Sequence, residues 1–249
     1  MNRIPFRPHF QNEDDFAGEI IHSHDYQNPA PYKGKRVLGV GMGNSGAEIA
    51  LDLCEKDVET YISVRGPVNI VPREVFGRPT QVTALYIGIL PHWLGDALGL
   101  AVRRFTVGDL PKYGIELPAI SPAKQLRETG QTPVIDLGTL DYIRSGQLKV
   151  LPGIEHFGSS SVLFTNGEEL RFDTVILATG FRALLSEWLN LDEDNFDQRE
   201  LPRSPIGAGS YQGLYFLGYN NYAPGVGLGI IRYDVHTVID ALVNTPTPA

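Results

Sequence analysis

The sequence predicts an α/β fold with a parallel sheet, and three features of the chain lead to this prediction. A short apolar run over residues 36–40 is followed at once by a glycine-rich turn and a stretch with helical periodicity. A second β-rich run, over residues 59–65, comes directly after that helix. Short β-rich runs return from residue 146 onward. A strand, a helix and a strand in this order are typical of a Rossmann-like domain, in which helices cover a parallel sheet.

The composition limits the kinds of partner that the chain can have. Its 249 residues are 42% hydrophobic, which is enough for a sizeable core. A net charge of −8 argues against nucleic acid or an anionic membrane, because both bind basic surfaces. We therefore expect a small-molecule substrate. The single cysteine, Cys54, cannot form an internal disulfide, which fits a reducing compartment.

The sequence also gives an expectation about membranes and location. The most apolar window, residues 84–102, is interrupted by Pro91, His92 and Asp96, which a membrane span would not contain. The first residues of the sequence have no apolar stretch typical of a signal peptide. A cytoplasmic protein without a membrane span is expected.

Along the chain, the sequence divides into three parts. Residues 1–33 are polar and rich in proline and are expected to form an extended linker. Residues 34–181 are expected to form the nucleotide-binding domain. Within this domain, residues 75–130 carry helix-like apolar runs broken by prolines, which indicates a mostly helical insertion. Residues 182–249 form a separate C-terminal segment.

The later elements are predicted from short patterns. Residues 147–154 have strand character, and Asn166–Gly167 between two β-rich runs predicts a hairpin. Residues 173–181 are expected to form a buried strand and residues 213–219 a further strand. An amphipathic helix is expected over residues 229–242. Its predicted inward face consists of Ile230, Ile231, Val235, Val238, Ile239 and Leu242.

The glycine-rich turn predicts a dinucleotide site. Gly41, Gly43 and Gly46 form G-x-G-x-x-G directly after a strand and at the start of a helix. The first glycine permits a tight turn, the second lets a pyrophosphate approach the backbone, and the third allows the helix to pack closely on the strand. Free N–H groups at the helix start would then bind the phosphates. The alternative is a glycine-rich turn that binds no ligand.

The end of the second strand indicates which dinucleotide binds. NAD sites place an acidic residue there, whereas NADP sites place a cation near the 2′-phosphate. Here the strand leads to Arg65, and Glu59 stands at its opposite end. An arginine matches a phosphate in charge and geometry, so NADP(H) is favoured. Arg73 is a second candidate, and the alternative for Arg65 is a solvated surface cation.

No set of catalytic side chains can be identified. The chain has neither the tyrosine and lysine pair of short-chain dehydrogenases nor a G-x-S-x-G turn. A lone cysteine without an H-E-x-x-H motif gives no metal-ligand set, so no metal is expected. The catalytic residues therefore stay unknown, and the chemistry is expected to come from a cofactor.

Further motifs give the chain a family resemblance. Phe16, Gly18, His22 and Tyr26 fit the pattern F-x-G-x-x-x-H-x-x-x-Y, which resembles the identifying sequence of the flavin-containing monooxygenases. The glycine loop has the form G-x-G-N-S-G that is usual in this family. Residues 71–77 are similar to a segment of the YUCCA-type plant monooxygenases and their bacterial relatives. Residues 175–181 resemble the family's ATG motif, and residues 213–221 resemble its late strand that reaches the flavin.

The resemblance implies an NADPH-dependent flavin monooxygenase that oxygenates a small organic substrate through a C4a-hydroperoxyflavin. It implies NADP(H) and FAD as cofactors, with Arg65 on the 2′-phosphate and with Thr179 and Gly180 bordering the nicotinamide. His22 and Tyr26 are expected either to order a junction between domains or to act directly in catalysis. The residues implied to hold the NADPH phosphates are Gly41, Gly43, Asn44, Ser45 and Gly46.

The chain departs from the family at one important point. Full members carry an additional N-terminal Rossmann half with its own glycine fingerprint for FAD. Before Gly41 this chain has only Gly18, Gly34 and Gly39, which cannot form that fingerprint. The resemblance therefore implies an NADP-binding domain followed by a remnant of the FAD-type domain, with a chain that supplies the missing half as one expected partner. The alternatives are a flavin-free NADP(H)-binding module and an inactive remnant whose strands at residues 175–181 and 213–219 lack neighbours.

Overall fold

The computed structural model describes residues 4–198, 200–219 and 228–244, with the side chains of residues 228–230 excepted. Its chain forms two compact units. The larger unit consists of residues 5–122 and 133–180, and the C-terminal unit contains residues 123–132 and the described residues from 181 onward. Among all described residues, no helix combines the length and apolarity that a membrane span requires.

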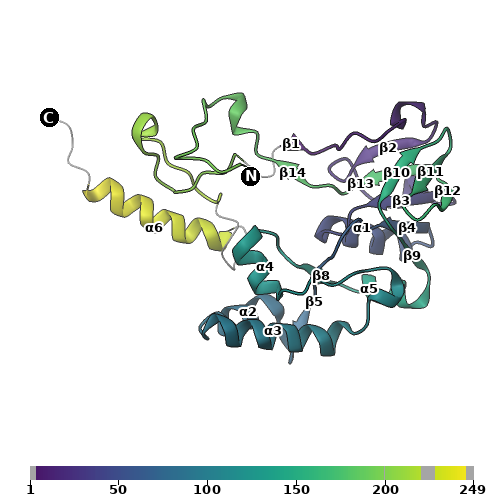
Figure 1. Ribbon diagram of the computed structural model, residues 1–249, viewed down its shortest axis with the longest axis horizontal. Coiled ribbons are helices and arrows are strands. Elements are labelled where there is room, and N and C mark those ends of the chain that lie inside the picture. Colours follow the sequence, from purple (N-terminus) through teal and green to yellow (C-terminus); the bar gives the residue numbers. More distant parts are fainter. Residues whose placement is uncertain (1–3, 199, 220–227, 245–249) are drawn as a thin grey trace. The chain divides into compact units, whose positions relative to one another are not determined.

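The larger unit contains most of the regular structure (Figure 1). Its strands are β2 (Glu19–His22), β3 (Arg36–Val40), β4 (Glu59–Ser63), β5 (Ile70–Pro72), β6 (Glu74–Val75), β7 (Arg78–Pro79), β8 (Val134–Asp136), β9 (Leu148–Leu151), β10 (Ile154–Phe157), β11 (Ser161–Phe164), β12 (Glu169–Arg171) and β13 (Thr174–Leu177). Its helices are α1 (Asn44–Cys54), α2 (Thr80–Ile87), α3 (His92–Val107) and α5 (Thr139–Ser145), and short 3₁₀ turns cover Glu13–Asp15, Ala30–Tyr32 and Pro111–Tyr113.

A parallel sheet with the order β2-β13-β3-β4-β9 organises the larger unit. From β3 the chain passes through α1 to β4 on one side, while β13 pairs with β3 on the other side. The strand order thus reverses at β3 and β13, and in open α/β sheets ligands bind at the carboxyl ends of strands at such a point. The predicted α/β, Rossmann-like class is confirmed.

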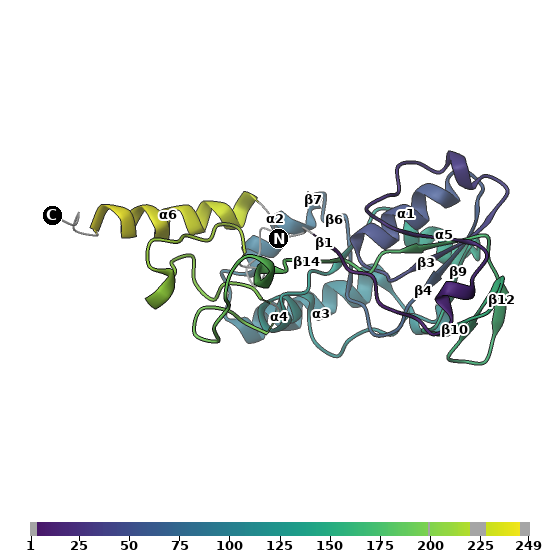
Figure 2. The same ribbon diagram turned by 90° about the horizontal axis from the view of Figure 1, so that it is seen from above.

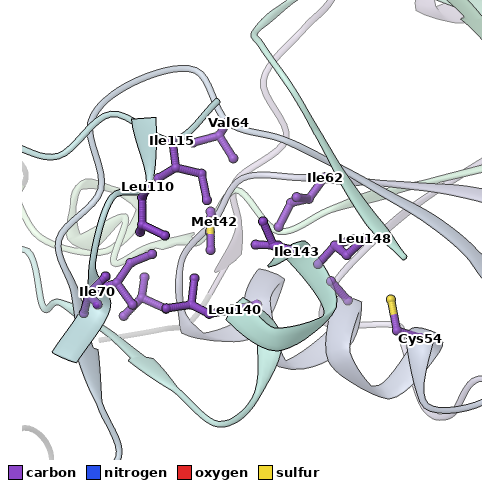
Figure 3. Packing of buried hydrophobic residues seen from close by; sticks show 14 residues of the cluster. Met42, Cys54, Ile62, Val64, Ile70, Leu110, Ile115, Leu140, Ile143 and Leu148 are labelled. Atoms are coloured by element: carbon purple, nitrogen blue, oxygen red, sulfur yellow. The ribbon is translucent and has the colours of Figure 1, made fainter. Parts of the chain in front are cut away.

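Successive side chains of β4 point to opposite faces of the sheet, and both faces are covered. Tyr61 packs in a cluster with Phe164 and Phe172, and the antiparallel sheet β10-β11-β12 covers this face. Ile62 points to the opposite face, where α1 and α5 contribute Ala50 and further apolar side chains (Figure 3). The sheet is therefore the middle layer of three, as Figure 2 shows from a second direction. The hairpin predicted at Asn166–Gly167 is confirmed, because β11 and β12 pair antiparallel around it.

The segment predicted as a helical insertion does contain helices α2 and α3. Helix α4 spans Pro122–Thr129. Its first residue, Pro122, belongs to the larger unit, and its other residues belong to the C-terminal unit. β5 and β8 flank the segment in sequence and pair with each other in parallel. The insertion therefore begins and ends at neighbouring strands.

The segment predicted as an extended linker includes the edge strand of the main sheet. β2, residues 19–22, pairs in parallel with β13 over four residue pairs. β13 therefore has a neighbour on each side and is fully buried. The hypothesis that residues 175–181 form a strand without neighbours is wrong, because β2 and β3 supply them.

The C-terminal unit contains β14 (Phe181–Arg182), 3₁₀ turns at Leu185–Glu187 and Gly209–Tyr211, and helix α6 (Leu228–Asn244). The strand predicted at residues 213–219 is wrong, since only an isolated bridge between Tyr215 and Ile206 forms there. Gly213 and Gly218 adopt φ angles of 90° and 79°, which interrupt an extended run at both ends. Asn220 and Asn221, the last residues of the resembling stretch, lie outside the described residues.

The predicted C-terminal helix is confirmed as α6, but its inward face is narrower than predicted. Val238 is buried, whereas Ile239 and Leu242 are 49% and 54% exposed. Asp234 is buried one turn before Val238, and its carboxylate accepts a hydrogen bond from the Gly218 amide at 2.8 Å. The side chain of Ile230 lies outside the described residues. A polar anchor thus replaces part of the apolar stripe that periodicity predicted.

Candidate functional site

The glycine loop lies between the carboxyl ends of β3 and β13. Gly41 adopts a φ of 99°, and its amide donates to the Ser63 carbonyl at 2.9 Å. A Cβ atom on Gly41 would lie 2.9 Å from the Ala178 carbonyl oxygen, and one on Gly46 would lie only 2.0 Å from the Gly41 carbonyl oxygen. Both glycines are therefore required by the close approach of α1 to the sheet.

Gly43 differs from the other two glycines because nothing crowds it. No heavy atom outside its neighbours lies within 4 Å of a Cβ built on Gly43. It is also the N-cap of α1, and no side chain caps that helix start. The first helix N–H groups, on Asn44, Ser45 and Gly46, have no partner within the helix, and such groups attract anions together with the helix dipole. The residues present fit the pyrophosphate of a dinucleotide.

The two polar side chains of the loop have different surroundings. Ser45 is exposed. The Asn44 side chain contacts the backbone around β8: its Oδ1 accepts from the Ile135 amide at 2.8 Å and its Nδ2 donates to the Pro133 carbonyl at 3.4 Å. Sequence reasoning missed these contacts, because no local pattern links positions 91 residues apart.

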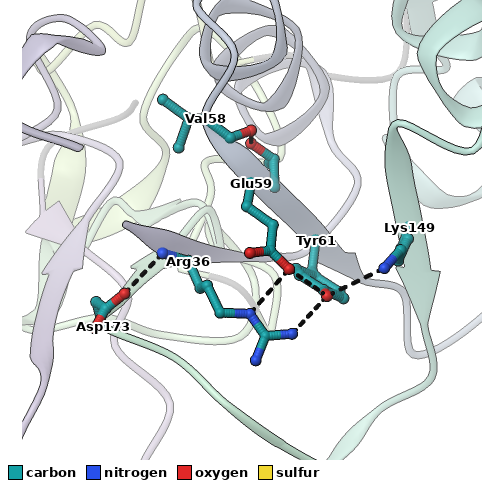
Figure 4. A network of polar contacts seen from close by, with 7 residues as sticks. Arg36, Val58, Glu59, Tyr61, Lys149 and Asp173 are labelled. Atoms are coloured by element: carbon teal, nitrogen blue, oxygen red, sulfur yellow. Dashed lines mark hydrogen bonds and ion pairs between the residues drawn. The ribbon is translucent and has the colours of Figure 1, made fainter. Parts of the chain in front are cut away.

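Arg65 follows β4 on the same side of the sheet as the glycine loop. It is exposed, and within the part of the chain that the structure describes it forms no ion pair. Glu59 lies at the amino end of β4 and is engaged there by Arg36 at 3.0 Å and by the Tyr61 hydroxyl at 2.8 Å (Figure 4). The residue that follows β4 at this edge of the sheet is therefore a cation, and the acid of the strand lies at the opposite end. Arg73, between β5 and β6, is also exposed.

The residues of the ATG motif continue from β13 at the same edge of the sheet. The Thr179 hydroxyl donates to the Phe6 carbonyl, and the Phe6 amide donates to the Gly180 carbonyl at 2.8 Å. Phe6 was not predicted as part of this region. The residues next to the glycine loop are thus held in place by the N-terminal segment of the chain.

His22 also binds this turn. Its Nδ1 accepts a hydrogen bond from the His24 amide at 3.1 Å, so its Nε2 carries the proton that is donated to the Gly180 carbonyl at 3.0 Å. The side chain is completely buried. Burial lowers the pKa of His22 below its ordinary value of 6.5, and Arg7 and His24 act in the same direction. Both ring nitrogens of the neutral imidazole are thus engaged by backbone groups.

The other residues of the identifying motif have structural contacts as well. Phe16 packs edge-on against Phe157, with ring centroids 5.3 Å apart. A Cβ on Gly18 would lie 2.5 Å from the Phe16 ring and 2.8 Å from the Asp173 carbonyl oxygen, so a larger residue there would push against the backbone of Asp173. The Tyr26 hydroxyl donates to Asp52 on α1 at 2.6 Å. The motif therefore joins the edge strand β2 to the sheet and to the helix of the glycine loop.

The described residues before β3 do not fit the pyrophosphate of FAD. They form short strands, 3₁₀ turns and connecting backbone, and none of these is a strand, a glycine-rich turn and a helix in succession. Gly18 packs on Phe16, and Gly34 does not lie at the start of a helix. The part of the chain that the structure describes thus offers one site of dinucleotide type.

Known proteins resemble both the sequence and the fold. Residues 2–193 match the sequence profile of the flavin-binding monooxygenase-like family. The chain belongs to this family. Among its flavin monooxygenase relatives are the probable indole-3-pyruvate monooxygenases YUCCA7 and YUCCA3 of Arabidopsis thaliana, 36% and 40% identical over 96% and 85% of this chain. The matches cover 54% and 49% of those proteins, so the chain spans about half the length of these relatives.

Solved flavin monooxygenases have the same fold. A flavin-containing monooxygenase from Stenotrophomonas maltophilia superposes with a TM-score of 0.63 at 21% identity, covering 96% of this chain and 59% of that one. A mutant form of a flavin monooxygenase from the same organism gives a TM-score of 0.64 at 23% identity, covering 96% of this chain and 60% of that one. At these sequence identities, the superpositions show a similar fold and nothing about function.

Proposed function

We propose that this chain is the NADPH-binding part of a flavin-dependent monooxygenase that oxygenates a small organic substrate. The observation that carries the proposal is the glycine loop, where crowded Gly41 and Gly46 flank an open Gly43 at an uncapped helix start. When bound, NADPH supplies the hydride that reduces the flavin. The chain itself binds and orients the coenzyme, and membership of the flavin-binding monooxygenase-like family supports this assignment.

Each part of the coenzyme has a proposed partner in the larger unit. The main-chain N–H groups of Asn44, Ser45 and Gly46, with Gly41 and Gly43 shaping the turn, would hold the pyrophosphate. Arg65 would bind the 2′-phosphate, because its guanidinium is exposed and has no carboxylate partner among the described residues. Thr179 and Gly180 would border the nicotinamide.

The flavin is proposed to come from an FAD-binding half that these residues do not provide. That half would be contributed by a further segment or by another chain. The curated relatives are named indole-3-pyruvate monooxygenases, so an indolic 2-oxo acid is the first substrate to assay. An alternative function is a flavin-free NADP(H)-binding module, which the single dinucleotide-type site of the described residues favours.

Titration calorimetry with NADPH and NADH tests the coenzyme assignment. We expect NADPH to bind more tightly to the wild-type chain, and Arg65→Ala to weaken NADPH binding by roughly 10- to 100-fold with little effect on NADH. Arg171→Ala, an exposed arginine on β12, is the matched control and should leave both affinities unchanged. If Arg73→Ala weakened NADPH binding and Arg65→Ala did not, the 2′-phosphate would be assigned to Arg73. Equal affinity for the two coenzymes, or none, would contradict the proposal.

The visible spectrum of the purified chain tests the flavin assignment. Flavin absorbance that co-purifies, or that appears when FAD and a complementary FAD-binding half are added, supports the monooxygenase. Oxygen-dependent oxidation of NADPH by that mixture would then establish activity. A colourless chain that binds NADPH and never gains flavin under either condition supports the flavin-free module.

A further inference from the structure

Asn44 occupies the first position of α1, and its side chain reaches the backbone at β8. Its amide group uses both of its functions there, accepting from the Ile135 N–H at 2.8 Å and donating to the Pro133 carbonyl at 3.4 Å. Asn44 contacts one edge of β8, and β5 pairs with the other edge to complete a two-stranded sheet. Asn44 therefore occupies the open edge of a two-stranded sheet, where a third strand would otherwise pair.

Other contacts join α1 and its loop to the same segment. The Thr139 hydroxyl, buried at the start of α5, donates to the Ala47 carbonyl at 3.0 Å. Met42, inside the glycine loop, is buried in one apolar cluster with Ile70 of β5 and Leu110, as Figure 3 shows. The loop that receives the phosphates thus shares a packed surface with both strands that flank the helical insertion.

The contacts continue from these strands into the insertion. Asn69, directly before β5, accepts from the guanidinium of Arg103 near the C-terminal end of α3, and the Asn69 carbonyl accepts from the Val134 amide at 2.8 Å. Arg103 is buried and also donates to the Pro118 carbonyl at 2.9 Å. A continuous series of hydrogen bonds therefore runs from Asn44 through β8 and β5 to α3. Such a series is a physical route for coupling when its members move together.

We propose that Asn44 is a positioning residue that couples coenzyme binding in the glycine loop to the placement of β8 and the helical insertion. This proposal rests on the proposed function, because it requires a coenzyme in the loop. The expectation that Asn44 helps to hold the NADPH phosphates is kept, with its side chain engaged at β8. The main-chain N–H of the same residue remains available for the phosphate, so one residue would contact the coenzyme and β8 at once.

The chemistry of the side chain explains why asparagine suits this position. An aspartate would lose the donor to Pro133 and add a negative charge beside the phosphates, and a serine hydroxyl is too short to bridge two backbone groups in this way. A coenzyme that fixes the first turn of α1 would fix the Asn44 Cα, and hence the acceptor of the Ile135 N–H. Coenzyme binding should therefore protect that N–H from exchange with solvent.

Amide hydrogen exchange of the full chain, read at Ile135 with and without saturating NADP⁺, tests the direction of the effect. The proposal predicts that exchange at Ile135 slows by roughly tenfold or more when the coenzyme binds, as expected for one hydrogen bond made more persistent. If Asn44 turned to a phosphate instead, the Ile135 N–H would lose its acceptor and its exchange would accelerate. Faster or unchanged exchange with bound coenzyme would overturn the proposal.

An Asn44→Ala variant tests the role of the side chain. Without coenzyme, exchange at Ile135 should accelerate relative to wild type, and NADP⁺ should no longer slow it, while coenzyme affinity falls only about 5- to 10-fold. Asn195→Ala is the matched control, because Asn195 also bridges two loop segments, accepting from the Ala208 amide at 2.9 Å, but does so in the C-terminal unit. That variant should keep the full effect of NADP⁺ at Ile135.

The two proposals can fail separately. A wild-type chain that binds no NADP⁺ refutes the coenzyme site and with it the coupling. A wild-type chain that binds NADP⁺, together with an Asn44→Ala variant that retains protection at Ile135, refutes only the positioning role. Both results are read from the same samples.

Discussion

The three glycines of the loop have different physical reasons for being glycine. A Cβ atom on Gly46 would overlap the Gly41 carbonyl oxygen, whereas a Cβ atom on Gly43 would meet no other atom. The backbone of Gly43, at φ −87° and ψ −177°, is extended and open to any residue. Packing therefore requires Gly46, and only a bound ligand would require Gly43.

Gly46→Ala should destabilise the fold. A methyl group 2.0 Å from a backbone oxygen forces α1 away from β3, which should lower the free energy of unfolding by about 3 kcal/mol. Urea denaturation followed by circular dichroism measures this change. A variant as stable as the wild type would mean that α1 does not pack against β3 as described.

Gly43→Ala should instead affect only the coenzyme. The free energy of unfolding should change by less than about 1 kcal/mol, because the backbone is unstrained and the added methyl meets no atom. NADPH affinity should fall by roughly tenfold or more, since the methyl would occupy the space of the pyrophosphate. Calorimetric titration gives the affinity, and an unchanged value would place the phosphates elsewhere.

His22 should make the stability depend on pH. The pKa of His22 is lower in the folded state than in the unfolded state. Below about pH 6.5, His22 therefore binds a proton in the unfolded chain more readily than in the folded protein, where it is buried. The contribution of His22 is complete above that pH and declines as the pH falls through the folded-state pKa, at up to about 1.4 kcal/mol per pH unit. Asp25 and the Gly180 carbonyl oppose this shift, and Arg7 and His24 add to it.

Denaturation at pH 7.5 and pH 5.5 measures the effect. His22→Gln should reduce the loss of stability between these two conditions, while His92→Gln, at an exposed position on α3, should leave it unchanged. A pH dependence that survives in His22→Gln would assign the effect to other groups.

At this scale the sequence predicted residue types better than residue partners. The tight turn at Gly41 and the close packing at Gly46 could be predicted because a backbone turn depends on adjacent residues, and the role of Gly43 at a pyrophosphate stays a prediction. The partners of His22 and Asn44 could not, because they lie 158 and 91 residues away along the chain. Each contact depends on which strands become neighbours in the sheet, and no local pattern contains that information.

The helices of the insertion present an apolar outer surface. Helix α2 has no buried residue although most of its side chains are apolar, and Phe105 and Trp93 on α3 are 88% and 73% exposed. The exposed large apolar side chains between residues 76 and 105 are Phe76, Val82, Leu85, Tyr86, Ile89, Trp93, Leu98 and Phe105. A second group of exposed apolar side chains, which includes Ile239, Leu242 and Val243, lies on α6.

Two substitutions on α3 separate its faces. Phe105→Ser should change the free energy of unfolding by less than about 0.5 kcal/mol and reduce binding of an apolar dye. Val107→Ala, two residues on and 2% exposed, should cost about 2 kcal/mol, because it removes buried methyl groups from the main cluster. Denaturation curves of the two variants measure the contrast. Equal losses would mean that Phe105 is buried in solution.

Elements with strong local signals were predicted well, and elements that depend on tertiary context were not. The run at residues 36–40 became β3 with the predicted bounds because its apolar residues end at an obligatory glycine turn. The run at residues 213–219 has similar β-forming residues, but within the described part of the chain it forms only the bridge to Ile206, and two glycines with positive φ interrupt it. Periodicity likewise located α6 but not the buried Asp234 that anchors it.

At the scale of the molecule, each unit has its own core. The larger unit encloses the parallel sheet between α1 and α5 on one face and β10-β11-β12 on the other. The C-terminal unit packs a separate apolar cluster around Phe196 and Phe216, whose rings lie 5.5 Å apart. All residues proposed to bind NADPH belong to the larger unit. A ligand that binds there stabilises directly only the structure that unfolds together with its site.

NADP⁺ should therefore protect the two units unequally. A coenzyme at 100 times its dissociation constant adds about 2.7 kcal/mol to whatever unfolds with the site. Exchange of the Ile176 amide in β13 should slow by roughly 100-fold, and exchange of the Phe216 amide, which donates to the Pro205 carbonyl at 2.8 Å, should change little. NADH at the same concentration is the control and should have a smaller effect at Ile176, because it lacks the phosphate that Arg65 would bind. Equal protection of both amides would mean that the units unfold as one, and the C-terminal unit would then share the stability that the coenzyme confers.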